Sequence, residues 1–215
     1  MTESPKTRLQ SILRTHIDAA AERWLDEATA SRSIDQLCRA YTAVPKHVGR
    51  APMGDREYDR WTADDAARCV LLLGVAERME PHAFAAAATE CFERGDSREQ
   101  QSWLRALSLM PEPERFCATA IDACRTNIVP LFESIACENP YPARYFPEPN
   151  FNQMVLKAMF NDIALARIVG LSDRSNVELT RMAADYAAER RAAGRSVPPD
   201  IALAMQRTIH EELRR

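Results

Sequence analysis

A proline-rich segment, residues 138–151 (ENPYPARYFPEPNF), interrupts a chain that is otherwise rich in helix-forming residues. Besides two tyrosines, two phenylalanines and Arg144, it contains four prolines: Pro140, Pro142, Pro147 and Pro149. Each proline fixes φ, lacks an N–H donor and biases the preceding residue toward an extended conformation. We therefore expect the proline-rich segment to cross the fold as a stiff, largely extended strap.

The rest of the chain predicts an all-α fold. Alanine, leucine, glutamate and arginine are frequent, only six glycines occur, and no stretch alternates β-branched with polar residues. Capping pairs mark helix starts at Thr62 with Asp65 and at Asp96 with Glu99. Helices of about eleven to eighteen residues with short connections fold back on one another as antiparallel neighbours. We expect a single domain over residues 1–215, a stack of antiparallel helices resembling HEAT-like repeats. Because no literal repeat is present, an irregular bundle is the competing description.

Two further stretches have local signals of their own. Residues 44–61 contain Pro45, Gly49, Pro52 and Gly54 among many charges, which predicts a surface loop. The pair Pro198-Pro199 predicts the start of a final helix that runs to the carboxyl terminus.

Charge, hydropathy and cysteine spacing restrict the classes of function. Lys and Arg total 28 against 31 Asp and Glu, a net charge of −3, which argues against sequence-independent binding of nucleic acid. The first ten residues lack an apolar signal core and no apolar run could cross a bilayer, so we expect a cytoplasmic protein. The six cysteines form no CxxC and have no histidine at ligand spacing, which favours free thiols without a metal. No GxSxG, GxxxxGK or GxGxxG motif indicates a catalytic site or a cofactor.

The first candidate site combines the proline-rich segment with the helix that follows it. Two cations, one carboxylate, two amides and two phenols lie within twenty positions: Glu138, Asn139, Tyr141, Arg144, Tyr145, Asn152 and Lys157. In one interpretation these residues bind a ligand, with Arg144 holding a carboxylate or phosphate between tyrosine rings. In the other, they hydrogen-bond to backbone groups that the prolines leave unpaired. We favour the structural role for most of them.

The second candidate site is a charged stripe on the helix that Asn176 is predicted to start. Arg181, Asp185 and Glu189 are spaced four residues apart and therefore share one face. Two carboxylates at this spacing repel unless a cation lies between them, and Arg144, Lys157 or Arg190 could supply the charge. We favour an internal network of ion pairs that clamps the proline-rich segment. A metal ion is the weaker alternative, because the ligands would be oxygens of a single stripe without a nearby histidine.

A set of short motifs spans the second half of the chain. Residues 136–147 read ACENPYPARYFP, residues 152–158 read NQMVLKA, and residues 167–171 read RIVGL. They are followed by these positions: Asn176, Glu178, Leu179, Met182, Asp185, Tyr186, Ala187, Glu189, Arg190, Ala192, Ala193, Gly194 and Arg195. Together the motifs resemble those of the bacterial EboA family, over residues 96–199. One departure is Phe151, at a position where tryptophan is most often expected.

The resemblance implies a pathway but no catalytic residues. Proteins of this family occur beside a UbiA-like prenyltransferase, a metal-dependent hydrolase-like protein and TIM-barrel proteins, in clusters for secondary metabolites or their movement to the cell envelope. We therefore expect a non-enzymatic helical-repeat binding or scaffold protein that supports secondary-metabolite biosynthesis or transport. Its expected partners are proteins of the same cluster or a small metabolite, without nucleic acid or a membrane span, and peripheral membrane contact is compatible with this role. The alternative is an enzyme or small-molecule binder with a polar pocket between residues 138–157 and the helix at 176–192.

Overall fold

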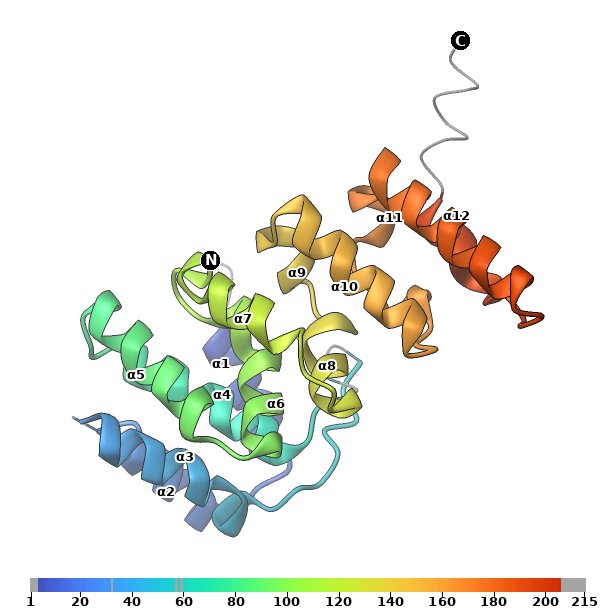
Figure 1. The fold of residues 1–215 in the computed structure, drawn as a ribbon. Helices are drawn as coiled ribbons and strands as arrows, with labels where there is room; N and C mark the ends of the chain where they lie inside the picture. Colours follow the sequence, from blue (N-terminus) through green and yellow to red (C-terminus); the bar gives the residue numbers. More distant parts are fainter. Residues whose placement is uncertain (1–3, 32, 57, 59, 206–215) are drawn as a thin grey trace. The chain divides into compact units, whose positions relative to one another are not determined.

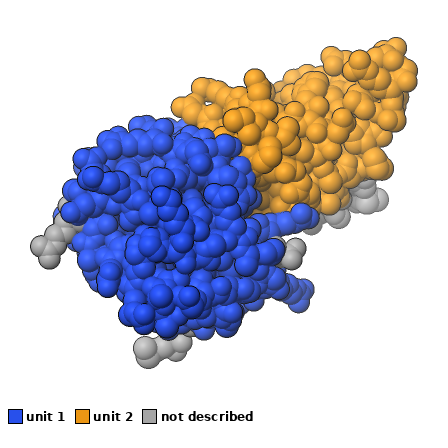
Figure 2. Space-filling model, turned by 90° about the horizontal axis from the view of Figure 1, so that it is seen from below, with its two compact units in different colours: residues 1–120 blue, residues 121–215 orange. Residues whose placement is uncertain are grey.

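The computed structural model describes residues 4–31, 33–56, 58 and 60–205, and these form an all-α fold, as predicted (Figure 1). Apart from one isolated β-bridge between Pro52 and Thr62, the regular structure of the described residues is helical. The chain divides into two compact units, unit 1 (residues 1–120) and unit 2 (residues 121–215) (Figure 2). Among the described residues, each helix is too short or too polar to cross a membrane.

Unit 1 is built around one buried helix, α4 (Ala63–Ala76), which packs against its neighbours on several sides. Every residue of α4 from Ala63 to Val75 is buried, because the helix carries a nearly continuous apolar sequence from Cys69 to Val75. The surrounding helices are α1 (Pro5–Arg14), α2 (Ala19–Ala28), α3 (Ile34–Val48), α5 (Pro81–Arg94) and α6 (Ser97–Ala106). Two short 3-10 helices follow, η1 (Leu107–Leu109) and η2 (Pro113–Phe116). Helix α7 (Cys117–Ala123) spans the boundary with unit 2.

Both predicted capping pairs begin helices of unit 1. The Asp65 carboxylate accepts a hydrogen bond from the Thr62 N–H (3.0 Å) at the start of α4. The Glu99 carboxylate accepts from the Asp96 N–H (3.1 Å) at the start of α6. These local contacts satisfy donors that the first helical turn leaves free, which explains why the two helix starts are readable from sequence.

The predicted loop at residues 44–61 begins later than expected, because α3 continues through Pro45 to Val48. A proline inside a helix leaves the carbonyl four residues earlier without its usual donor. Here that carbonyl belongs to Tyr41, and the guanidinium Nε of Arg68 donates to it instead (3.1 Å). The remaining loop returns to the unit through the bond from the Met53 N–H to the Trp61 carbonyl (2.9 Å). A charged side chain from a neighbouring helix thus replaces the backbone bond that Pro45 removes.

Unit 2 is centred on α10 (Glu148–Phe160), which packs against α8 (Val129–Ala136) and α12 (Val177–Ala192). Its shorter helices are α9 (Tyr141–Tyr145), α11 (Leu171–Arg174) and the 3-10 helices η3 (Leu165–Arg167) and η4 (Pro199–Ala204). The predicted final helix begins at Pro199 as the 3-10 helix η4, and residues 206–215 lie outside the described part of the chain.

The prediction of a largely extended strap over residues 138–151 is wrong. The proline-rich segment contains all of α9 and the first turn of α10, and only Phe146 and Pro147 between them are extended. Pro142 and Pro149 lie in the first turns of the two helices, where a backbone N–H has no partner within the helix. The prolines therefore start helices here, and the predicted loss of helical hydrogen bonds does not occur.

Candidate functional site

The short helix α9 is held by the guanidinium of Arg174 at the end of α11. Nη1 of Arg174 donates to the carbonyl of Ala143 (2.6 Å), and Nη2 donates to the carbonyl of Phe146 (2.8 Å). The guanidinium carbon also lies 4.8 Å from the centre of the Phe151 ring. Carbonyls at the end of a helix lack intrahelical donors. A cation at this end also interacts favourably with the negative pole of the helix dipole. Arg174 thus fixes the end of α9 and stacks on the first turns of α10.

Close approach of α11 to α9 depends on a glycine. Gly170, which precedes α11, has φ +74°, in the left-handed region that favours glycine. A Cβ at this position would lie 2.7 Å from the Cβ of Ala143, too close for ordinary packing. Both residues belong to the motifs that resemble the EboA family, so two separate motifs meet at this contact.

The expected clamp on the proline-rich segment comes from Arg174 and not from Arg144. Arg144 lies on the exposed face of α9, and its side chain makes no hydrogen bond or ion pair with any residue that the structure describes. Tyr141, by contrast, is fully buried, with its ring 4.8 Å from that of Tyr145 and 6.1 Å from that of Phe146. The buried face of α9 is therefore aromatic, and its cation points outward.

Glu138 and Asn139 organise the turn before α9. Glu138 has φ +51°, its carboxylate accepts from Arg167 at 2.8 and 3.0 Å, and its N–H donates to the Arg167 carbonyl (2.9 Å). The buried amide of Asn139 donates to the Ser134 carbonyl (3.0 Å), while its oxygen accepts from the Tyr141 N–H (3.0 Å). Both polar side chains are thus engaged with the chain itself.

Asn152 and Asn176 form a reciprocal pair between α10 and α12. The amide of Asn152 donates to the oxygen of Asn176 (3.1 Å), and the amide of Asn176 donates back (2.9 Å). Both are buried, and the Asn176 oxygen also accepts from the Leu179 N–H (2.8 Å) at the first turn of α12. Sequence analysis identified Asn176 as a helix cap and Asn152 as a site residue, and the structure brings the two together.

Lys157 holds the turn that follows α7. Its ammonium donates to the carbonyls of Cys124 (2.7 Å) and Thr126 (2.6 Å) and lies 5.3 Å from the centre of the Phe132 ring. Lys157 also lines a hollow of about 410 Å³ together with Cys124 and Phe146. The ammonium already has two carbonyl partners there, so it is not positioned as a free anion-binding group.

The charged stripe on α12 does not clamp the proline-rich segment. Arg181 binds Glu178 (2.6 and 3.0 Å) and Asp185 (2.6 Å), and all three are exposed. Hydrogen bonds from Arg181 hold the pKa of the Glu178 carboxyl below its usual value. Glu189 is exposed, and its side chain makes no hydrogen bond or ion pair with a described residue. Pairs of this kind belong to the solvated face of a helix, where each adds little stability.

A groove of about 270 Å³ lies beside this stripe, between α10 and α12. Its apolar and aromatic lining comes from Leu156, Phe160, Met182 and Tyr186, and its polar rim contains Gln153, Glu178, Arg181, Asp185 and Glu189. Phe160 is 59% exposed, although its ring packs edge-on against Tyr186 at 5.0 Å. The groove therefore unites the predicted charged stripe with an exposed aromatic surface that sequence analysis did not identify.

Unit 1 contains a buried charge network that sequence analysis also missed. Asp64 accepts from Arg68 (2.9 Å), while Asp65 accepts from Arg105 (3.1 and 3.2 Å) and from the Ser102 hydroxyl (2.6 Å). Asp64, Asp65 and Arg68 are each at most 1% exposed. The sequence signal for this network was three charged residues, at positions 64, 65 and 68, directly before the longest apolar stretch of the chain. Each carboxylate has several donors, as a stable buried charge requires.

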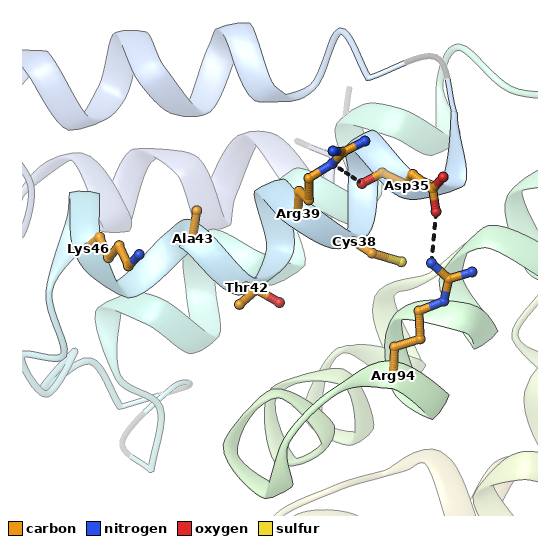
Figure 3. A pocket seen from close by; sticks show the side chains of 7 residues that line it. All are labelled: Asp35, Cys38, Arg39, Thr42, Ala43, Lys46 and Arg94. Carbon is orange, nitrogen blue, oxygen red and sulfur yellow. Dashed lines mark hydrogen bonds and ion pairs between the residues drawn. The ribbon is translucent and has the colours of Figure 1, made fainter.

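No group of three or more histidine, cysteine or acidic side chains in the described part of the chain is arranged to hold a metal ion. The structure describes all six cysteines, and none of them forms a disulfide. Unit 1 has a hollow of about 510 Å³, which lies along α3 and α5 and is lined by Cys38 with several charged residues (Figure 3).

Comparison with known protein families identifies the family of this chain. The family described as metabolite traffic protein EboA matches residues 6–206, which extends the resemblance from residues 96–199 to nearly the whole chain. No curated protein and no solved structure matches the chain. The chain belongs to the EboA family of metabolite traffic proteins.

Proposed function

We propose that this protein is a non-enzymatic binding protein of metabolite traffic and that the groove between α10 and α12 is its ligand site. The observation that carries the proposal is the lining of this groove, in which an exposed phenylalanine and further apolar side chains lie beside charged side chains. Small-molecule sites combine a mostly apolar wall with a few polar groups that orient the ligand. The family membership supports a role in metabolite traffic.

The groove favours an amphipathic ligand with an aromatic or aliphatic body. Phe160, Met182 and Leu156 offer apolar contact, and Tyr186 adds a second ring beside Phe160. The charged rim has three carboxylates and one guanidinium, and that guanidinium is already shared by Glu178 and Asp185. The surplus of negative charge favours a neutral or cationic polar group on the ligand over an anionic one.

The polar residues of unit 2 support binding over catalysis. The best placed of them, Asn139, Asn152, Lys157 and Arg174, donate to backbone or amide oxygens of the unit itself. Proton transfer at neutral pH favours a carboxylate in a desolvated setting. The carboxylates of the groove, by contrast, lie on an exposed helix face.

Replacing Phe160 with serine is expected to remove most of the bound ligand. The exposed ring contributes apolar contact to the groove, and its loss from the fold costs only the edge-on contact with Tyr186, about 0.5–1.5 kcal/mol. The full chain is incubated with the small-molecule fraction of its native host, recovered by gel filtration, and analysed by native mass spectrometry. Wild type is expected to carry a ligand that Phe160→Ser loses at least tenfold.

Val177→Ser is the matched control for this experiment. Val177 is 76% exposed at the start of the same α12 helix, but it does not line the groove. This variant should therefore retain the ligand at the wild-type level. Equal retention by wild type and Phe160→Ser, or equal loss by both variants, would place the binding elsewhere.

A further inference from the structure

Two thiols on neighbouring helices of unit 1 lie close together. The sulfur of Cys38 on α3 is 3.6 Å from the sulfur of Cys91 on α5, although the residues are 53 positions apart in the sequence. A disulfide needs a sulfur–sulfur distance near 2.05 Å, so the sulfurs would have to approach by about 1.5 Å. Helices α3 and α5 already pack against each other, so the movement that the disulfide requires is an approach of the two side chains.

One of the two thiols is accessible and the other is enclosed. Cys38 is half-buried and lines the hollow of about 510 Å³ along α3, from which its side chain extends toward the helix that carries Arg94 (Figure 3). Cys91 is buried beneath it. A small oxidant can therefore reach the Cys38 sulfur first. The Cys91 sulfur lies within van der Waals distance of it.

Cations outnumber carboxylates among the side chains that line the hollow. Three cations, Arg39, Lys46 and Arg94, line it against one carboxylate, Asp35. Asp35 binds Arg94 (2.8 Å), and its backbone carbonyl accepts from Arg39 (3.1 Å). Arg94 also binds Glu90 (2.6 Å), so its charge is shared between two carboxylates. Burial raises the pKa of the Cys91 thiol, which leaves the geometry of the pair and the access to Cys38 as the basis for its reactivity.

We propose that Cys38 and Cys91 are a redox-modifiable pair that hydrogen peroxide converts to a disulfide. The Cys38 thiolate attacks the peroxide; the O–O bond breaks, a sulfenic acid forms and the second oxygen leaves as water after taking a proton. The Cys91 thiol then attacks the sulfenic sulfur; the S–S bond forms, the S–O bond breaks and a second water carries away the remaining proton. Two electrons pass from the two thiols to the peroxide.

The disulfide would join α3 covalently to α5. It closes a loop of 53 positions that includes the buried helix α4, and cross-links of long loops restrict the unfolded chain most. The oxidised protein is therefore expected to unfold at a higher temperature than the reduced protein. Reduction with dithiothreitol should reverse the change, because no further oxidation of either sulfur is involved.

Oxidation of the full chain by stoichiometric hydrogen peroxide tests the proposal. After prior reduction, treatment should remove two of the six free thiols, measured under denaturing conditions with N-ethylmaleimide and mass spectrometry. Peptide mapping should find the peptide that contains Cys38 linked to the one that contains Cys91 within one chain. The thermal midpoint should rise and should return on reduction.

Two variants separate this pair from general oxidation. Cys38→Ser, at the half-buried position, should abolish both the thiol loss and the thermal shift. Cys124→Ser should keep both, because Cys124 lies in unit 2 and burial raises the pKa of its thiol to about 12. If folding of a variant is affected, the peptide map of wild type alone decides. Peroxide that modifies other cysteines while Cys38 and Cys91 stay free, or that links them between chains, overturns the proposal.

Discussion

Replacing Asp64 with alanine is expected to lower the free energy of unfolding of unit 1 by about 3–5 kcal/mol, as for other buried ion pairs that lose one partner. The substitution leaves the guanidinium of Arg68, 1% exposed, without its carboxylate. It also removes the nearest negative charge from Arg50 and Arg98, whose nitrogens lie 3.7 Å from Asp64. Urea unfolding followed by tryptophan fluorescence measures the effect in unit 1, since all three tryptophans lie within residues 1–120.

Asp35→Ala is the matched control for this measurement. Asp35 also pairs with an arginine, Arg94 at 2.8 Å, but both side chains are more than half exposed. An exposed ion pair in water contributes little, so this variant should lose only a small fraction of what Asp64→Ala loses. Similar urea midpoints for the two variants would mean that the buried ion pairs of Asp64 do not stabilise unit 1 more than an exposed ion pair does.

Replacing Arg174 with alanine is expected to lower the free energy of opening of residues 141–151 by about 2–4 kcal/mol. Two hydrogen bonds from a charged donor are lost, along with the stacking of the guanidinium on Phe151. The carbonyls of Ala143 and Phe146 lose the side-chain donor that ends α9. Hydrogen exchange followed on peptides that cover α9 and the start of α10 measures this local opening directly.

Arg144→Ala provides the comparison within the same short helix. Its side chain is exposed and has no hydrogen-bond partner among the described residues, so the change should stay within about 0.5 kcal/mol. Faster hydrogen exchange of residues 141–151 in Arg144→Ala than in Arg174→Ala would mean that Arg144, and not Arg174, stabilises α9. Arg174→Lys should fall between wild type and Arg174→Ala, because an ammonium lacks the planar fork that reaches both carbonyls.

Features fixed by neighbouring residues could be predicted from the sequence. The capping pairs at Thr62 and Asp96 act over three positions, and the side-chain pattern within that span was sufficient to place the starts of α4 and α6. The all-α class follows from the same local preferences, summed along the chain. Prolines misled the prediction at residues 138–151, because the same residue that breaks a helix interior is well suited to a first turn.

Contacts between distant positions could not be predicted. Nothing in the sequence distinguishes Arg174 from Arg144 as the cation that meets α9, since the choice depends on how α11 packs some thirty positions later. The Asp64–Arg68 pair has the spacing of an ordinary solvated helix face, and only the packing of α4 at the centre of unit 1 makes it buried. The thiols of Cys38 and Cys91 meet for the same reason, through the packing of α3 against α5.

Binding without chemical change is the central claim, and mass balance tests it most directly. The full chain is incubated with the small-molecule fraction of its native host, and the mass and amount of every species are followed over time in the bound and free pools. We predict that the bound molecule keeps its mass and never exceeds about one molecule per groove. A new molecular species that accumulates to many copies per chain, and that is absent without the protein, would contradict this claim.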